Sequence, residues 1–100
     1  MDKTEHLLTC LIEECSEIQK VAAKALRFGL NDHHPDIPGV TNAEDITREC
    51  ADMIAVYEML IDERIIPTLD VVGLKQKKRE KVLKYIEYAK DCGTLKIAKT

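Results

Sequence analysis

"LIEECSEIQKVAAKALRFG", residues 11 to 29, decides the fold class of this chain. Apolar residues return every three or four positions along the stretch, and they continue upstream as far as Leu7, which is the spacing of one helix face. Gly29 follows the last periodic residue and suits a C-terminal cap. The sequence therefore predicts an amphipathic helix from about Thr4 to Phe28.

Two further helices follow a loop. "LNDHHPDIPGV" contains two prolines and a glycine, which is typical of a loop. "TNAE", Thr41 to Glu44, is a capping box that predicts a second helix, with an apolar stripe up to Ile65 and with Pro67 ending or bending it. A third helix is predicted from Leu74 to a cap at Gly93, and the tail after it is expected to fray.

The composition agrees with a single all-α domain over residues 1–100. Four glycines, three prolines and 4% aromatic residues leave little material for a turn-rich β architecture. Long amphipathic helices on a chain of 100 residues cannot easily enclose a core alone. We therefore expect long antiparallel helices that form a four-helix-bundle-like core on dimerisation.

Charge, hydropathy and cysteine content limit the expected partners and location of the protein. A net charge of −3 argues against nucleic acid as a partner. No apolar run has the length of a membrane span and no secretory signal is recognisable, so we expect a cytoplasmic protein with no membrane partner. Cys15 and Cys50 fall on apolar stripes, and they are interpreted as small buried hydrophobes.

Acidic residues are spaced alike on the first two predicted helices. Glu14 and Glu17 are three residues apart, as are Glu49 and Asp52, so each pair shares a helix face beside its apolar stripe. If the helices pack antiparallel, the four carboxylates converge. Such a group needs a cation, and Mg²⁺ prefers oxygen ligands and bridges carboxylates to phosphates. The alternative is a pair of solvated helix faces. A di-iron site is excluded because it needs histidines in the helices.

The two motifs, "EECSE" and "ECAD", resemble the Glu-Glu-x-x-Glu and Glu-x-x-Asp signature of the MazG-like all-α nucleoside triphosphate pyrophosphatases. The flanking "KALRFG" and "TNAEDI" resemble small phage-encoded members, and the similarity covers roughly residues 7 to 93. The linker between Glu17 and Glu49 is longer than in most members. The excess lies in "NDHHPDIPG", which enlarges a loop and affects the mouth that would receive the base.

This resemblance implies Mg²⁺-dependent hydrolysis of a (deoxy)nucleoside triphosphate to the monophosphate and pyrophosphate. Carried over to this sequence, it makes Glu14, Glu17, Glu49 and Asp52 the Mg²⁺ ligands. Glu13 matches the first glutamate of the motif and is the candidate catalytic residue that orients or deprotonates the attacking water. The alternative is that a metal ligand does so.

Basic residues near these motifs are candidate phosphate-binding groups. Lys24 projects within about 20° of Glu17 on a helix, and Arg27 lies on the same flank. Within "KQKKREK" the spacing of three and four places Lys75, Lys78 and Arg79 on one face. The alternative for each is a solvated helix face, and for the basic run a nucleic-acid patch is a further alternative, which the lack of interleaved aromatic residues disfavours. His33 and His34 are interpreted as loop residues that, if functional, touch base or ribose.

The function predicted from the sequence is thus a homodimeric or homotetrameric nucleotide pyrophosphohydrolase that binds a nucleoside triphosphate. Two alternatives stay open. One is a phosphoribosyl-ATP pyrophosphatase, which belongs to the same superfamily. The other is a non-catalytic helical interaction module that keeps the acidic faces without using them.

Overall fold

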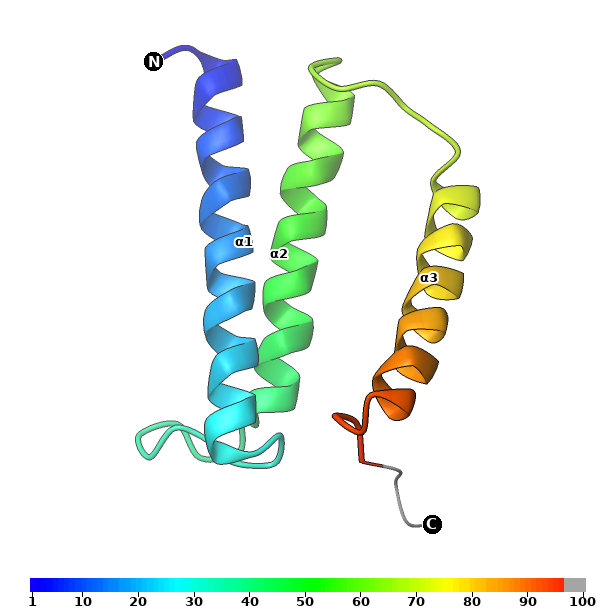
Figure 1. Cartoon of the computed structure of the whole chain (residues 1–100). Coiled ribbons are helices and arrows are strands. Elements are labelled where there is room, and N and C mark those ends of the chain that lie inside the picture. The colour runs from blue at the N-terminus through cyan, green and yellow to red at the C-terminus, as the bar shows by residue number, and fades with distance from the viewer. Residues whose placement is uncertain (97–100) are drawn as a thin grey trace. The chain divides into compact units, whose positions relative to one another are not determined.

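Three helices make up the computed structural model, which describes residues 1–96: α1 (Lys3–Phe28), α2 (Asn42–Asp62) and α3 (Val71–Asp91) (Figure 1). The described part contains no strand beyond an isolated bridge between His33 and Thr41. The predicted all-α class is therefore confirmed. None of these helices combines the length and apolarity that crossing a membrane needs. The end of the tail that was expected to fray lies outside the described residues.

The chain forms two compact units, one from Met1 to Pro67 and the other from Thr68 onward. In the first unit α1 and α2 run antiparallel and pack side by side along their lengths (Figure 1). Their contact buries Leu7 and Val21 of α1, and it buries Leu60 of α2 completely. This helical hairpin carries both acidic motifs.

Both ends of α1 are capped by the residues that the sequence offers. Asp2 accepts a hydrogen bond from the backbone N–H of Glu5, and the Glu5 side chain returns one to Asp2, which completes a capping box. At the other end Gly29 adopts φ 99° and ψ 151°, a conformation that is essentially restricted to glycine. The predicted helix and its cap are confirmed.

The start of α2 is tied back to the end of α1. The buried Asn42 side chain donates from Nδ2 to the Gly29 carbonyl oxygen at 2.8 Å, and its backbone N–H donates to the Asp32 carbonyl oxygen at 2.8 Å. Thr41 caps the helix by accepting from the Glu44 N–H at 3.1 Å. The Glu44 carboxylate lies 3.9 Å from Arg48, so the capping box is formed from the threonine side only.

The end of α2 corrects the sequence prediction, because the helix stops at Asp62, well before Pro67. Arg64 adopts a left-handed φ of 58°, and its N–H donates to the Ile61 carbonyl oxygen at 2.9 Å. The next N–H, that of Ile65, donates to the Leu60 carbonyl oxygen at 3.0 Å. This is a Schellman motif with arginine in the place that glycine usually takes. Because the sequence has no glycine there, the helix end could not be predicted from it.

The second unit is built around α3. Asp70 caps the helix by accepting from the Gly73 N–H at 3.0 Å, so the helix begins before the predicted Leu74. At its end Gly93 has φ 77°, and the Thr94 N–H donates to the Ala89 carbonyl oxygen at 3.1 Å, as predicted for a glycine cap. No residue of α3 is buried.

The interpretation of Cys15 as a buried hydrophobe is wrong for this chain on its own. Both Cys15 and Cys50 are free thiols. The Cys15 side chain is exposed, and Cys50 is half-buried. The reason is that α1 has only α2 to pack against within the hairpin. The part of its apolar stripe that faces away from α2 remains in water, and Cys15 lies there.

Candidate metal centre

Three carboxylates from two helices converge halfway along the hairpin. Oxygen atoms of Glu14 on α1 and of Glu49 and Asp52 on α2 all lie within 4.8 Å of one another. Glu14 and Glu49 are half-buried at the edge of the helix contact, and Asp52 is exposed. The antiparallel packing thus joins residues that are far apart in the sequence.

The electrostatics of this group are unfavourable without a cation. Partial burial raises the pKa of the Glu49 carboxyl above its ordinary value, and the carboxylate of Asp52 raises the same pKa next. Glu17, Glu14 and Asp45 add smaller contributions in the same direction. A cation bound among these carboxylates would neutralise their charge and so stabilise the ionised form of Glu49.

The donor set fits Mg²⁺. Carboxylate oxygens are the hard ligands that this ion prefers, at about 2.1 Å from the metal. Two ligands on opposite sides of one ion are then about 4.2 Å apart. Oxygen atoms already within 4.8 Å of one another therefore need only small side-chain rotations to share an ion. The side of the group at Asp52 remains available for water or phosphate oxygens, because Asp52 is exposed.

The other acidic residues predicted for the site lie further out. Glu17 is exposed and does not join the closest three, although its charge acts on Glu49. Glu13 is also exposed and stands outside the group. Three of the four predicted ligands are therefore brought together directly. The fourth, Glu17, is near enough for its charge to raise the pKa of Glu49.

The two predicted phosphate-binding residues of α1 have different surroundings. Lys24 is half-buried, makes no ion pair with any residue in the described range, and lines a cavity of about 300 Å³. The Arg27 guanidinium instead lies over the Phe28 ring, 4.8 Å from its centroid, as a cation–π pair. Of these two residues, Lys24 is the one that lines a cavity and has no aromatic or acidic partner in the described part of the chain.

The remaining predicted cations, Lys75, Lys78 and Arg79, all belong to α3 and are exposed. Their helical spacing is confirmed, so they share one face of that helix. Lys78 and Arg79 border an apolar surface hollow of about 330 Å³. They belong to the second unit, whereas the carboxylates belong to the first.

The sequence reasoning did not single out Asn42, which is the buried polar residue of the hairpin and lines the same cavity as Lys24. Its only signal in the sequence is its position directly after the cap Thr41. The cavity depends on how the loop folds, and helical periodicity says nothing about that.

Comparisons of the chain with protein-family models, with curated proteins and with solved structures gave no match.

Proposed function

We propose that this protein is a Mg²⁺-dependent nucleoside triphosphate pyrophosphohydrolase, which cleaves its substrate to the nucleoside monophosphate and pyrophosphate. The observation that carries the proposal is the convergence of Glu14, Glu49 and Asp52 from two helices. Its support is the resemblance of "EECSE" and "ECAD" to the MazG-like signature, since the three residues that meet are among the four that the signature designates as ligands.

In this proposal Glu14, Glu49 and Asp52 hold the ion, with Glu17 as the fourth ligand after a side-chain rotation. When bound, Mg²⁺ supplies neutralisation of phosphate charge and lowers the pKa of a water molecule. The half-buried position of Glu14 and Glu49 fixes one side of the group against the helix contact. The exposed Asp52 leaves the other side open to the phosphates.

The proton of the attacking water needs an acceptor within the chain. Glu13 holds this role in the proposal, because it occupies the first position of the motif and its exposed carboxylate is free to approach a substrate. The alternative acceptor is one of the ligand carboxylates. Lys24, with no acidic partner in the described part of the chain, would meet phosphate charge that the ion leaves unmatched.

A substrate screen tests the proposal. The protein is incubated with each of the eight common ribo- and deoxyribonucleoside triphosphates, with and without Mg²⁺, and pyrophosphate and orthophosphate are measured separately. Mg²⁺-dependent pyrophosphate release that Asp52→Asn abolishes supports the proposal. Glu58→Gln, an exposed glutamate on the same helix, is the matched control and should keep wild-type activity. Absence of pyrophosphate release from all eight would contradict it.

Phosphoribosyl-ATP belongs in the same screen, because the biosynthetic pyrophosphatases of that superfamily hydrolyse the same type of bond. Preference for it over all eight triphosphates would favour the alternative enzyme. Folded protein that releases pyrophosphate from none of these compounds would favour the helical interaction module.

The proposed assembly is a homodimer or homotetramer with a four-helix core. Large apolar side chains that remain in water support it. Leu26 is 89% exposed and Ile12 is 67% exposed on α1. Side chains of this size each gain roughly 1.5–3 kcal/mol on full burial, which would contribute to association with a second copy of the chain.

A further inference from the structure

A cavity of about 300 Å³ lies at the loop end of the hairpin, apart from the carboxylate group. Its walls come from Lys24 and Phe28 of α1, from residues 32–35 of the connecting loop, and from Asn42 of α2. We call it the loop pocket. Its volume is at the lower end of the range for small-molecule sites, which suits a ligand fragment with one or two rings.

The loop pocket lies on the same flank of the hairpin as Glu17 and Glu49, one acid from each motif. Lys24 follows Glu17 by seven residues on α1, and Asn42 precedes Glu49 by seven residues on α2. Seven residues turn a helix to within about 20° of the starting direction and advance it by about 10.5 Å. Because the helices are antiparallel, both steps lead from the carboxylates towards the loop (Figure 1).

The walls of the pocket offer a stacking surface. The Phe28 side chain is 55% exposed, and the Arg27 guanidinium covers part of its ring at 4.8 Å from the centroid. Phe28 lines the pocket and Arg27 does not. An exposed aromatic face backed by a guanidinium is a surface on which a nucleobase stacks, whatever its identity.

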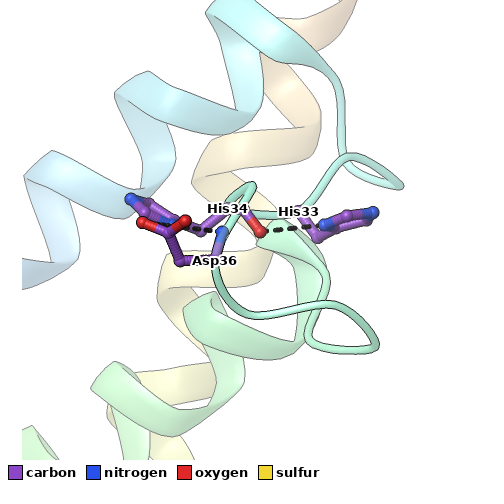
Figure 2. A network of polar contacts seen from close by, with 3 residues as sticks. All are labelled: His33, His34 and Asp36. Atoms are coloured by element: carbon purple, nitrogen blue, oxygen red, sulfur yellow. Dashed lines mark hydrogen bonds and ion pairs between the residues drawn. The ribbon is translucent and has the colours of Figure 1, made fainter.

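Polar groups of the pocket are held in fixed roles. His33 Nδ1 lies 2.9 Å from the His34 carbonyl oxygen and must donate to it, so Nε2 of neutral His33 is an acceptor. His34 Nδ1 accepts from the Asp36 N–H at 3.1 Å, so Nε2 of neutral His34 is a donor. The two rings extend to opposite sides of the loop (Figure 2). Asn42 Nδ2 is engaged with Gly29, which leaves its Oδ1 as an acceptor.

We propose that the loop pocket binds the base and sugar of the nucleotide, with Phe28 as the stacking surface and Lys24 at the side nearer the carboxylates. This inference rests on the proposed function for the identity of the ligand, since it places the phosphates about two to three helical turns away at Glu14, Glu49 and Asp52. The pocket recognises the nucleoside part of the substrate, and the carboxylate group recognises its phosphates through the metal.

The pocket is tested first without phosphate or metal. Adenosine, guanosine, cytidine and uridine are titrated separately into the Mg²⁺-free full chain at constant pH, and the imidazole resonances of the three histidines are followed by NMR. We expect saturable shifts at His33 or His34 with at least one nucleoside, and none at His6, which lies near the far end of α1. Phe28→Leu should remove the shifts, and Phe28→Tyr, which keeps a ring, should retain them.

Hydrolysis provides the second measurement. Phe28→Leu should raise KM for the triphosphate about tenfold, as expected for the loss of one base–aromatic stack, and should leave kcat within about twofold. His33→Ala and His34→Ala, each compared with His6→Ala, test the pocket if Phe28→Leu fails to fold by circular dichroism. Wild-type KM in Phe28→Leu, or in both histidine variants in that case, together with unshifted imidazoles would overturn the loop pocket and leave the hydrolase proposal standing. Nucleoside-induced shifts without hydrolysis of any triphosphate would support the loop pocket and overturn the hydrolase proposal.

Discussion

The Lys3 ammonium lies 2.7 Å from the Glu63 carboxylate, so the first turn of α1 meets the residue that follows α2. Both side chains are largely exposed, and an ion pair of this kind contributes little to stability. Its value is that it reports the register of the hairpin. Glu14 follows Lys3 by eleven residues and Asp52 precedes Glu63 by eleven, so Glu14 and Asp52 are level across the helix contact.

Three residues further on, the same register makes Glu17 level with Glu49. Two acids of the first motif, Glu14 and Glu17, are therefore level with the two acids of the second. In the metal-free protein this pairing costs electrostatic free energy, because like charges repel. The repulsion should affect stability, pH dependence and ligand binding.

Removal of one charge from the group should stabilise the metal-free protein. We expect Glu17→Gln and Asp52→Asn each to raise the free energy of unfolding by roughly 0.2–0.5 kcal/mol per like-charge contact removed, and to abolish turnover. Urea denaturation in the presence of a chelator measures the first effect. Glu58→Gln is the control and should change neither property. Lower stability in both site variants would show that the carboxylates do not repel one another.

The raised pKa of Glu49 gives a defined pH dependence. The folded protein binds the Glu49 proton more tightly than the unfolded chain does, so this stabilising contribution is complete below the ordinary pKa of 4.5. It is lost as the pH rises through the higher folded pKa. We expect the metal-free wild type to lose stability over this interval relative to Glu49→Gln, as measured by denaturation at successive pH values. Parallel curves for the two proteins would contradict the prediction.

Metal and nucleotide should bind cooperatively. The carboxylates alone should hold Mg²⁺ weakly, because the ion keeps most of its waters until phosphate oxygens complete its coordination. A non-hydrolysable triphosphate should therefore tighten Mg²⁺ binding, and Mg²⁺ should tighten nucleotide binding by the same factor. Calorimetric titrations in both orders measure the two factors. Equal nucleotide affinity with and without Mg²⁺ would leave the acidic group as a charged helix face.

Substitution of Lys24 separates phosphate binding from metal binding. We expect Lys24→Ala to weaken nucleotide binding about tenfold or more, because a charge-assisted contact to phosphate is lost, and to leave metal-only binding unchanged. Lys20→Ala, an exposed lysine one turn earlier on α1, is the matched control. The combined change of Lys75 and Arg79 to alanine asks the same question of α3. Unaltered nucleotide affinity in Lys24→Ala would remove this residue from the site.

Arg64 provides a test that does not involve the site. A left-handed conformation costs a non-glycine residue about 1–2 kcal/mol, and glycine costs about 0.5–1 kcal/mol through the unfolded chain. Arg64→Gly should therefore raise the free energy of unfolding by roughly 0.5–1 kcal/mol, and Gly93→Ala, at φ 77°, should lower it. Urea denaturation at one protein concentration checks both. A loss of stability in Arg64→Gly would mean that the arginine side chain makes a compensating contact.

Most of the helical framework could be predicted from the sequence, because its signals are local. Thr41, Gly29 and Gly93 each mark a helix end with a residue whose chemistry suits that position. The end of α2 could not be predicted in this way, since Arg64 adopts the glycine-like conformation without being a glycine. Pro67 is the residue near this end whose chemistry stops a helix, and it lies beyond Asp62, where α2 ends.

Only the part of the candidate site that follows from helix periodicity could be predicted from the sequence. Spacing of three residues places Glu49 and Asp52 on one face, and antiparallel packing brings Glu14 to them. Periodicity could not show that Glu17 stays outside the closest group. It also could not show that His33, His34 and Asn42 share a cavity with Lys24, because that depends on the path of the loop.

The level pairing of the two helices also determines where the chain can change length during evolution. One residue inserted into α1 between Glu17 and Lys24 would rotate every later position by about 100° and carry the lysine away from the flank that holds the carboxylates. An insertion near Gly39, between the helices, rotates nothing and adds only a small closure entropy. Homologues should therefore differ in length within residues 36–40 and keep the seven-residue intervals from Glu17 to Lys24 and from Asn42 to Glu49 unchanged.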